Sequence, residues 1–495
     1  MPASWDGATE AESLKRRPSD LSEDGVVSPP AKIAKSNGNG DAFHSSARAP
    51  AAEPVMSKDE IMDARRKHIG PNVPVFFPEE PLHIVRGRGQ YFYDDEGRKI
   101  LDCINNVCHV GHCHPHVVAR AQKQMAELNT NSRYLHEEIV RYAKRLTAYL
   151  PESLSVCYFC CTGSEANELA ARMARAYTGG REIIGVDGAY HGHTQLLIDF
   201  SSYKHNHPGY KPGVGDHASV VSMPCTYRGE FRDPATAGEL YAADVKRAID
   251  EIHERKEQVS AFFCEGLMSC GGQIVLPDGY LKHAYKHVRD AGGVCVADEV
   301  QVGFGRVGTH FWAFETQGVV PDIVTMGKPI GNGHPLAVVV TTPEIAAAFA
   351  KTTSYFNTYG GNPVSCAVAN AVLDVIEDEK LQSHALQVGQ EILAGYRQLK
   401  EKHIVIGDIR GTGLMLGLDL VKDRETREPA TDIATELIHR MKRERILVSQ
   451  DGPANNVIKL KPPMCFSSAD AKLLLSNIDT MLGELEVKYG LVQNE

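Results

Sequence analysis

Between residues 115 and 363, short apolar runs alternate with helical patterns, and this alternation limits the fold more than any other feature of the chain. The apolar runs at 261–264, 293–297 and 323–326 have the composition of buried strands. Residues 165–177 place their small and apolar side chains on one face at helical spacing. This alternation predicts an α/β domain: a mostly parallel sheet with helices on both faces.

The segments on either side differ from this region in composition. Residues 1–58 are rich in Ser, Ala, Pro, Gly and charged residues, which predicts a disordered tail. Residues 364–485 begin with a long helix, and a hairpin and short mixed elements follow. We therefore expect a large domain at 115–363 and a smaller α+β domain at 364–485. Residues 59–114 are expected to join the smaller domain, and residues 486–495 to form a short tail.

Composition limits the classes of partner. The net charge of −10 argues against a nucleic acid as the main partner. No run of about 18 apolar residues occurs, so no transmembrane helix is expected. Twelve irregularly spread cysteines and the lack of an apolar secretory segment indicate reduced thiols in an intracellular protein.

A cluster of cysteine and histidine residues between positions 103 and 116 resembles a metal site at first sight. Its members are Cys103, Cys108, Cys113, His109, His112, His114 and His116. Structural zinc usually requires closer cysteine pairs than these four-residue intervals, so we expect no metal.

Lys328 and Asp298 each follow a predicted buried strand. Ligands of open α/β sheets bind beyond the carboxyl ends of the strands, so the two side chains are expected to converge. A lysine amine can form a Schiff base with an aldehyde cofactor, and a carboxylate can hold a pyridine nitrogen protonated. Asp298 alone would also be compatible with a helix cap. The pair predicts a pyridoxal phosphate site.

Other residues fit the remaining parts of such a cofactor. Gly163 and Ser164 open a predicted helix whose amides can bind phosphate, although simple capping by Ser164 explains the same pattern. Tyr190 can stack on the ring or belong to the core. Val300 is expected to cover the other ring face, and Gln301 to hydrogen-bond the ring hydroxyl oxygen.

Residues 303–308 match the pattern G-x-G-x-x-G of dinucleotide-binding proteins. That motif should open a helix after a strand, but residues 307–314 are rich in glycine, threonine and aromatic residues. We therefore reject a nicotinamide site.

Taken together, the motifs resemble those of the class III pyridoxal-phosphate-dependent aminotransferases, of fold type I, from residue 60 to residue 485. The matching stretches lie at 111–115, 163–167, 190–192, 297–301, 327–328, 358–363 and 410–414. The resemblance implies that Lys328 binds the cofactor covalently. It also implies that Thr358 reaches the phosphate in a neighbouring subunit, which makes the protein a homodimer or a tetramer built from dimers.

Arg410 resembles the family's arginine for the anionic group of the substrate. Many members carry a glutamate that masks this arginine, whereas this chain has Cys270 at that position. Without the mask, Arg410 is expected to face the site as a permanent cation, which suits a substrate with one fixed anionic group. Arg133 is expected to assist it.

Within the family, the chain resembles the phospholyase branch, with matches at 103–107, 128–136, 226–229, 269–273, 355–358 and 461–466. We therefore favour a lyase that eliminates phosphate from a phosphorylated amine such as ethanolamine phosphate, with Lys328 as the base. Transamination between alanine and glyoxylate, or from an ω-amine to a keto acid, is the alternative, and a cofactor-binding scaffold without catalysis is a third. The resemblance implies a mitochondrial location, with a cytoplasmic one as the alternative, since residues 1–58 give no clean presequence.

Overall fold

The computed structural model describes residues 56–205 and 213–492. The chain divides into two compact units, Met1–Gly70 and Pro71–Glu495. The described part of the first unit holds helix α1 (Lys58–His68), which Ser57 and Glu60 cap reciprocally. The prediction of a disordered tail at 1–58 falls almost wholly outside the described residues.

The second unit is built around a seven-stranded sheet. In spatial order its strands are β4 (Val156–Cys160), β10 (Ala337–Thr341), β9 (Ile323–Met326), β8 (Val294–Asp298), β7 (Val259–Glu265), β5 (Glu182–Val186) and β6 (Ala218–Val221). All neighbouring pairs are parallel except those of β10, which runs antiparallel to both β4 and β9. The predicted α/β fold with a mostly parallel sheet is confirmed.

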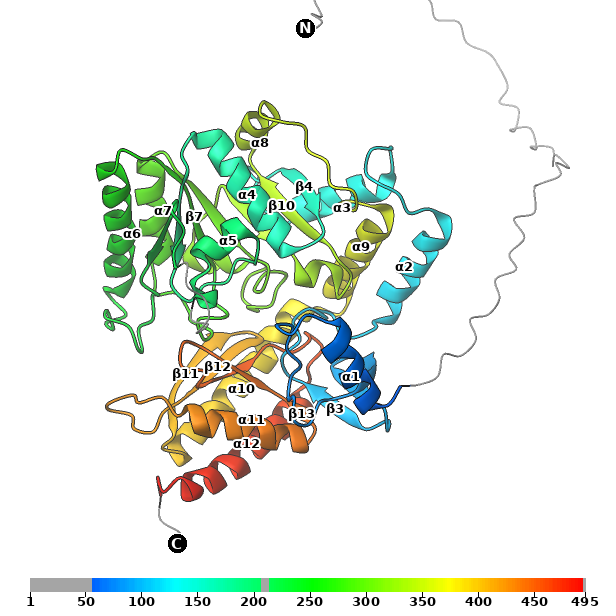
Figure 1. Cartoon of the computed structure of the whole chain (residues 1–495), viewed down its shortest axis with the longest axis vertical. Coiled ribbons are helices and arrows are strands. Elements are labelled where there is room, and N and C mark those ends of the chain that lie inside the picture. The colour runs from blue at the N-terminus through cyan, green and yellow to red at the C-terminus, as the bar shows by residue number, and fades with distance from the viewer. Residues whose placement is uncertain (1–55, 206–212, 493–495) are drawn as a thin grey trace, which may run out of the picture. The chain divides into compact units, whose positions relative to one another are not determined.

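Helices cover both faces of this sheet (Figure 1). Those of the region are α2 (Pro115–Glu127), α3 (Glu137–Thr147), α4 (Gly163–Thr178), α5 (Gln195–Phe200), α6 (Ala237–Glu254), α7 (Tyr280–Asp290), α8 (Pro343–Ala350) and α9 (Pro363–Asp378), with 3-10 turns η1 (Ser202–Lys204), η2 (Ala313–Gln317) and η3 (Lys328–Gly331). Successive residues of a strand point to opposite faces. On β7, accordingly, Ala261 and Phe263 pack with α4, whereas Phe262 and Cys264 pack with α6 and α7.

Two four-stranded sheets complete the unit. One contains β1 (Ile84–Arg88), β2 (Tyr91–Asp94), β3 (Lys99–Asp102) and β13 (Ile446–Leu447), and the other contains β11 (Ile406–Thr412), β12 (Met415–Leu420), β15 (Val457–Leu460) and β14 (Ser449–Asp451). Because β13 pairs with β3, the segment 59–114 shares a sheet with the C-terminal part of the chain. Helices α10 (Leu381–Lys402), α11 (Thr431–Arg443) and α12 (Ser468–Lys488) accompany these sheets.

Helix α12 continues three residues into the stretch 486–495, which the sequence predicts to be a tail. Its residue Glu486 is buried and accepts a hydrogen bond of 2.9 Å from the amide of Val405. This contact gives the last helical turn a tertiary partner, which explains why the helix extends to Lys488.

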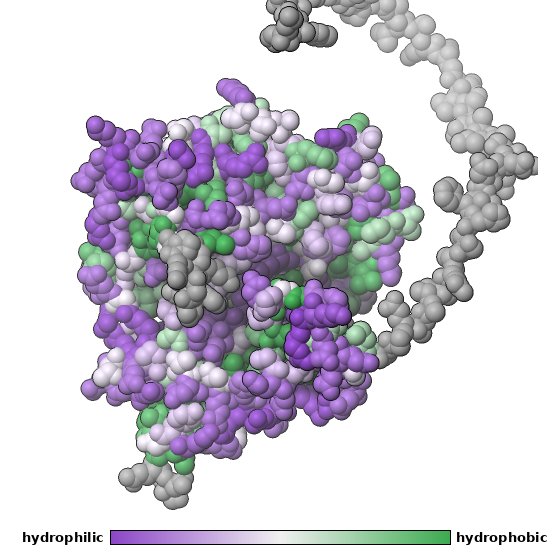
Figure 2. Space-filling model, viewed as in Figure 1, coloured by the Kyte–Doolittle hydropathy of each residue, from purple (hydrophilic) through white to green (hydrophobic). Residues whose placement is uncertain are grey.

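The surface seen in Figure 2 is mainly hydrophilic, with apolar residues in scattered positions. Within residues 56–205 and 213–492, no helix has the length and apolar character needed to cross a bilayer.

Candidate active site

Asp298 and Lys328 lie beyond the same edge of the seven-stranded sheet. Asp298 is the last residue of β8, and Lys328 follows β9 after Gly327. The two strands are adjacent and parallel, with Asp298 paired with Thr325. Lys328 has a φ of +27°, a region that residues other than glycine rarely adopt and that is concentrated at functional sites. The structure therefore brings together the two residues on which the predicted cofactor site depends.

Three hydrogen bonds fix the carboxylate of Asp298. The side-chain amide of Asn167 and the Nδ1 atom of His191 each lie 2.8 Å from Oδ2. The amide of Val300 donates to Oδ1 at 3.0 Å. Thr325 in turn donates to the oxygen of Asn167 at 2.6 Å, which orients that amide. Asp298 is 2 % exposed, so these donors take the place of water around a buried charge.

The neighbouring acid Glu265 does not compete for this charge. Glu265 pairs with Asp298 across β7 and β8. Burial, followed by the negative charge of Asp298, raises the pKa of Glu265 well above its usual range. The neutral form of Glu265 is therefore favoured.

Burial lowers the pKa of Lys328, and the charge of Asp298 opposes this shift. A lowered pKa increases the fraction of free amine, the form that attacks an aldehyde. Lys328 therefore has the electrostatic setting expected of a covalent anchor.

The first turn of α4 offers backbone amides for an anion. Thr162, not Ser164, caps this helix: its hydroxyl accepts from the amide of Glu165 at 3.1 Å. The alternative that Ser164 serves only as the cap is wrong. The hydroxyl of Ser164 instead lies 3.4 Å from the amide of His193. The amides of Gly163 and Ser164 bond to none of the described residues, and the helix dipole favours a negative group there.

Gly163 has no room for a side chain. A Cβ atom there would lie 2.9 Å from Cγ1 of Val300 and 3.1 Å from its Cγ2. Val300 therefore packs directly against the turn that offers the amides. The same isopropyl group lies 3.4 Å from the place of a Cβ atom on Gly327, beside Lys328.

Tyr190 lies at the same end of the sheet. Burial raises the pKa of Tyr190, and the nearby groups Cys270 and Asp298 add to this shift. Its ring meets that of Tyr203 edge to face, with 6.1 Å between the centroids. Tyr190 is only partly buried, which leaves part of the ring available to a ligand.

Gln301 joins the strand end to a second lysine. Its Oε1 atom accepts from the ammonium of Lys461 at 3.0 Å. Its Nε2 atom lies 3.8 Å from the sulfur of Cys270. The side-chain amide is therefore oriented with its nitrogen toward the loop that carries Cys270.

Arg410 is not the free cation that the sequence predicts. Its Nη1 atom contacts Asp408 at 2.7 Å, its Nη2 atom contacts Asp419 at 3.0 Å, and its Nε atom donates to the carbonyl of Gly272 at 2.7 Å. Two carboxylates from its own hairpin thus take the place of the missing glutamate. Arg410 does lie against the loop that carries Cys270, because Gly272 is two residues farther along it.

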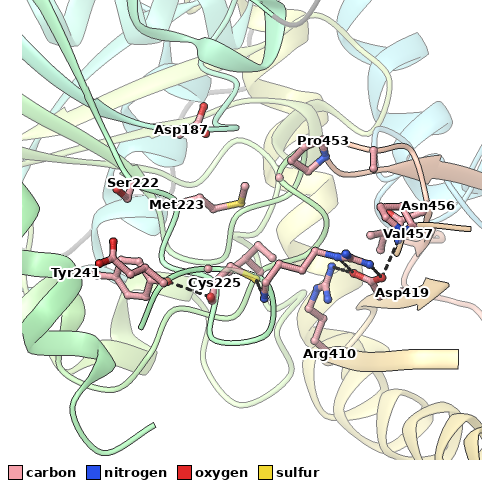
Figure 3. Close-up of a pocket in the computed structure, with 17 residues that line it drawn as sticks. Asp187, Ser222, Met223, Cys225, Tyr241, Arg410, Asp419, Pro453, Asn456 and Val457 are labelled. Atoms are coloured by element: carbon pink, nitrogen blue, oxygen red, sulfur yellow. Dashed lines mark hydrogen bonds and ion pairs between the residues drawn. The ribbon is translucent and has the colours of Figure 1, made fainter. Parts of the chain in front are cut away.

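Arg410 also lines a cavity of about 370 Å³ between the large sheet and the hairpin β11–β12 (Figure 3). Tyr241 lies on its opposite side. Arg228 also pairs with Asp419, so two guanidinium groups share this carboxylate. The charges around this cavity are largely compensated.

Arg133 and Thr358 both lie in exposed loops. The guanidinium of Arg133 stacks on the ring of Phe356 at 3.7 Å. Asn357 anchors the same loop to α4 by a hydrogen bond of 3.2 Å to Glu165. The predicted role of Thr358 at a neighbouring subunit and that of Arg133 in substrate binding stay predictions.

The structure adds Asn167, His191 and Lys461 to the site. Asn167 and His191 belong to motifs that the sequence singles out for their neighbours, Gly163 and Tyr190. Their contacts with Asp298 span 131 and 107 residues of sequence, so spacing gives no sign of them. Lys461 directly follows β15 (Val457–Leu460), and a lysine at the end of a strand usually points to solvent.

These residues fit pyridoxal phosphate. A fixed carboxylate, a partly buried lysine, free helix amides and a partly open tyrosine ring lie at one end of the sheet. In the described part of the chain, no group of three His, Cys, Asp or Glu side chains is arranged to hold a metal ion. His112 instead contacts Asp102 at 2.7 Å.

The sequence profile described as "Aminotransferase class-III" matches residues 77–482. The chain belongs to this family. The resemblance seen in the motifs is thereby confirmed, and the protein is a pyridoxal-phosphate-dependent enzyme of fold type I.

Relatives with two kinds of name match along most of the chain. The Drosophila melanogaster protein "Alanine--glyoxylate aminotransferase 2-like" is 53% identical over 428 residues, which cover 85% of this chain and 86% of the relative. The Caenorhabditis elegans protein "Ethanolamine-phosphate phospho-lyase homolog 1" is 42% identical, covering 89% of this chain and 97% of the relative. A solved Arthrobacter phospholyase in complex with phosphoethanolamine is 36% identical, with a TM-score of 0.81 and coverage of 86% of this chain and 99% of that one.

Proposed function

We propose that this enzyme is a phospho-lyase that converts a phosphorylated amine such as ethanolamine phosphate, with one water, to acetaldehyde, ammonia and phosphate. The observation that carries the proposal is Cys270. Many members of the family have a glutamate at this position that masks the substrate arginine, which allows one site to accept an amine and a keto acid in turn. This chain has a thiol there instead. The pKa of Cys270 is raised to about 11, first by burial, so the group is neutral at physiological pH. The similarity to a phospholyase with bound phosphoethanolamine supports the same reaction.

The residues of the strand ends would hold the cofactor. Lys328 would anchor it, Asp298 would contact its ring nitrogen, and the amides of Gly163 and Ser164 would bind its phosphate. Tyr190 and Val300 would enclose the ring. Gln301 would contact its hydroxyl oxygen. Pyridoxal phosphate bound in this way supplies an electron sink for the carbon that bears the substrate nitrogen.

The protein's own groups would carry out the proton transfer. Lys328, displaced by the substrate amine, removes a proton from the carbon that bears the nitrogen, because its lowered pKa makes the free amine accessible. Asn167 and His191 hold the carboxylate of Asp298 in position by hydrogen bonds. The C–O bond at the next carbon then breaks, and its electron pair leaves with the phosphate. Water finally releases acetaldehyde and ammonia.

Incubation of the purified holoenzyme with ethanolamine phosphate, without a keto acid, tests the proposal. Equal amounts of phosphate and acetaldehyde are expected. Conversion of alanine and glyoxylate to pyruvate and glycine, with no release of phosphate from ethanolamine phosphate, would sink it.

Transamination remains the second candidate, because the Drosophila relative carries an aminotransferase name at 53% identity. Transamination would share the proton removal by Lys328, but Lys328 would then return the proton without loss of phosphate. Both reactions are measured on the same protein sample, so their relative rates decide between them.

We also propose that the enzyme acts as a homodimer, whether or not dimers pair into tetramers. The loop with Thr358 exposes Phe356 and Tyr359, and Arg133 stacks on Phe356. A partner subunit would cover these rings, while Thr358 and Arg133 would reach its cofactor and substrate.

Mixing two inactive variants tests this arrangement. Lys328→Ala and Thr358→Ala homodimers each have two defective sites, whereas a mixed dimer has one site with both residues intact. Activity should therefore return after subunit exchange. If it does not return although mixed dimers form, Thr358 serves its own subunit.

We further propose a mitochondrial location. Relatives from Arabidopsis thaliana and Homo sapiens, at 41% and 38% identity, are named mitochondrial. Fusing residues 1–58 to a fluorescent protein tests it: import into mitochondria is expected, and a cytoplasmic signal would contradict it.

A further inference from the structure

Lys461 is a buried cation whose hydrogen-bond partners are neutral. Lys461 directly follows β15, and the residue is 8 % exposed. The ammonium donates to Oε1 of Gln301 at 3.0 Å and contacts the hydroxyl of Ser269 at 3.4 Å. Among the described residues, no carboxylate lies within 4.0 Å of its nitrogen. A buried charge without an opposite charge is costly, and such groups are concentrated at sites that bind ligands.

The neighbouring cations differ from Lys461 in this respect. Lys459 lies 3.0 Å from the carboxylate of Asp451. Arg410 contacts both Asp408 and Asp419. Lys461 thus differs from Lys459 and Arg410 in that no described carboxylate compensates its charge.

Backbone contacts hold Lys461 in place. Its amide donates to the carbonyl of Cys103 at 2.9 Å. The next residue, Pro462, accepts a hydrogen bond of 2.8 Å from the buried guanidinium of Arg306. The ammonium is therefore positioned before a ligand arrives, which lowers the entropic cost of binding.

The electrostatics of Lys461 connect it to the catalytic lysine. Burial, followed by the charge of Lys459 and more weakly that of Lys328, lowers the pKa of Lys461 to about 8, while Asp451 opposes this shift. Five titratable groups face Lys461. They are Lys459 from β15, Asp451 from β14, Glu265 from β7, Cys270 from the loop after β7, and Lys328. An anion bound between Lys461 and Lys328 would relieve the repulsion between the two.

We propose that Lys461, held by Gln301 and Ser269, binds the phosphate group of the substrate and receives it as it leaves. An ammonium serves this purpose because charge accumulates on the phosphate oxygen as the C–O bond breaks. The inference rests on the proposed phospho-lyase function and assigns its specificity to Lys461, not to Arg410.

Inorganic phosphate is the probe, because its binding requires no turnover. The holoenzyme is titrated with phosphate by calorimetry at pH 7, and the KM for ethanolamine phosphate is measured on the same samples. Lys461→Met should weaken phosphate binding and raise KM roughly 10- to 100-fold, the loss expected for a hydrogen bond to a charged group. Lys461→Gln keeps a polar group near Gln301 but removes the charge, and should behave in the same way.

The control is Lys422→Met. Lys422 belongs to the same part of the chain but pairs with Glu428 at 3.0 Å on the surface, so its loss changes the net charge equally. Both properties should stay at the wild-type level. Cofactor content and thermal unfolding are compared for all variants, and Lys461→Gln is decisive if Lys461→Met does not fold.

The outcomes separate the two proposals. Wild-type phosphate affinity in folded Lys461→Gln, with affinity lost in Arg410→Gln, would overturn the assignment to Lys461 while phospho-lyase turnover stands. Phosphate binding that depends on Lys461, in an enzyme that does not cleave ethanolamine phosphate, would refute the proposed function and keep the anion site.

Discussion

Replacing Gly163 with alanine tests how the first turn of α4 and Val300 jointly shape the cofactor site. The new Cβ atom would lie 2.9 Å from Cγ1 of Val300. Ordinary contacts between carbon atoms are about 3.5–4.0 Å, so one of the two groups must move by about 0.6 Å or more. Gly327 packs against the backbone of Gly163, which limits retreat in that direction.

Two effects of opposite sign compete in this variant. Alanine favours helix over glycine by up to ~1 kcal/mol. Overpacking costs roughly 1–3 kcal/mol, so a net loss is expected. Displacement of the turn should also weaken one charge-assisted hydrogen bond to the cofactor phosphate, which corresponds to roughly 10- to 100-fold in affinity.

The assay is titration of the apoenzyme with pyridoxal phosphate, followed by its visible absorbance, in a double-mutant cycle with Val300→Ala. Truncating Val300 removes both methyl groups that the new Cβ atom would meet. The double variant should therefore bind more tightly than the two single effects predict, by a coupling of at least ~1 kcal/mol. Wild-type affinity in Gly163→Ala, or a coupling near zero, would refute the steric argument.

Three further predictions concern the other residues of the site. Lys328→Ala should lose the visible absorbance of the covalently held cofactor, and a surviving band would show that another residue holds it. Asn167→Ala should lower the apparent Tm by ~5 °C, because Asp298 loses a hydrogen-bond donor and Thr325 loses an acceptor, both in buried positions. Differential scanning fluorimetry measures the Tm, and an unchanged value would contradict this prediction. Lys461, with a pKa of about 8, is charged below that pH and neutral above it, so KM for ethanolamine phosphate should be flat below pH 8 and rise about tenfold per unit well above it. In Lys461→Met this rise should be absent, and a KM that falls with pH in the wild type would refute the assignment.

The parallel core of the sheet is predictable because its strands are buried on both faces. Strands β7, β8 and β9 are buried throughout and mostly apolar; β8 ends in Asp298, and β9 ends two residues before Lys328. The antiparallel direction of β10 is less evident from the sequence, although the length of the segment before it indicates this direction. Only residues 327–336 separate it from β9, and a parallel crossover needs a dozen or more residues.

The positions of Asp298 and Lys328 follow from the sheet, but the partners of Asp298 do not. A strand end fixes where a side chain starts, and adjacent strands bring two such ends together. The donors Asn167 and His191 come from α4 and from the loop after β5, so their convergence depends on how α4 packs across the sheet. Residue spacing along the chain carries no information about that packing.

Arg410 and Lys461 show that the availability of a cation depends on strand register more than on residue type. Asp408 and Arg410 are two apart on β11, so their side chains share one face. Asp419 lies opposite Asp408 on β12, which places two carboxylates beside one guanidinium. Arg228 adds a second guanidinium at Asp419, so the four charges cancel. Lys461 meets an amide and a hydroxyl, and neither of these groups compensates its charge.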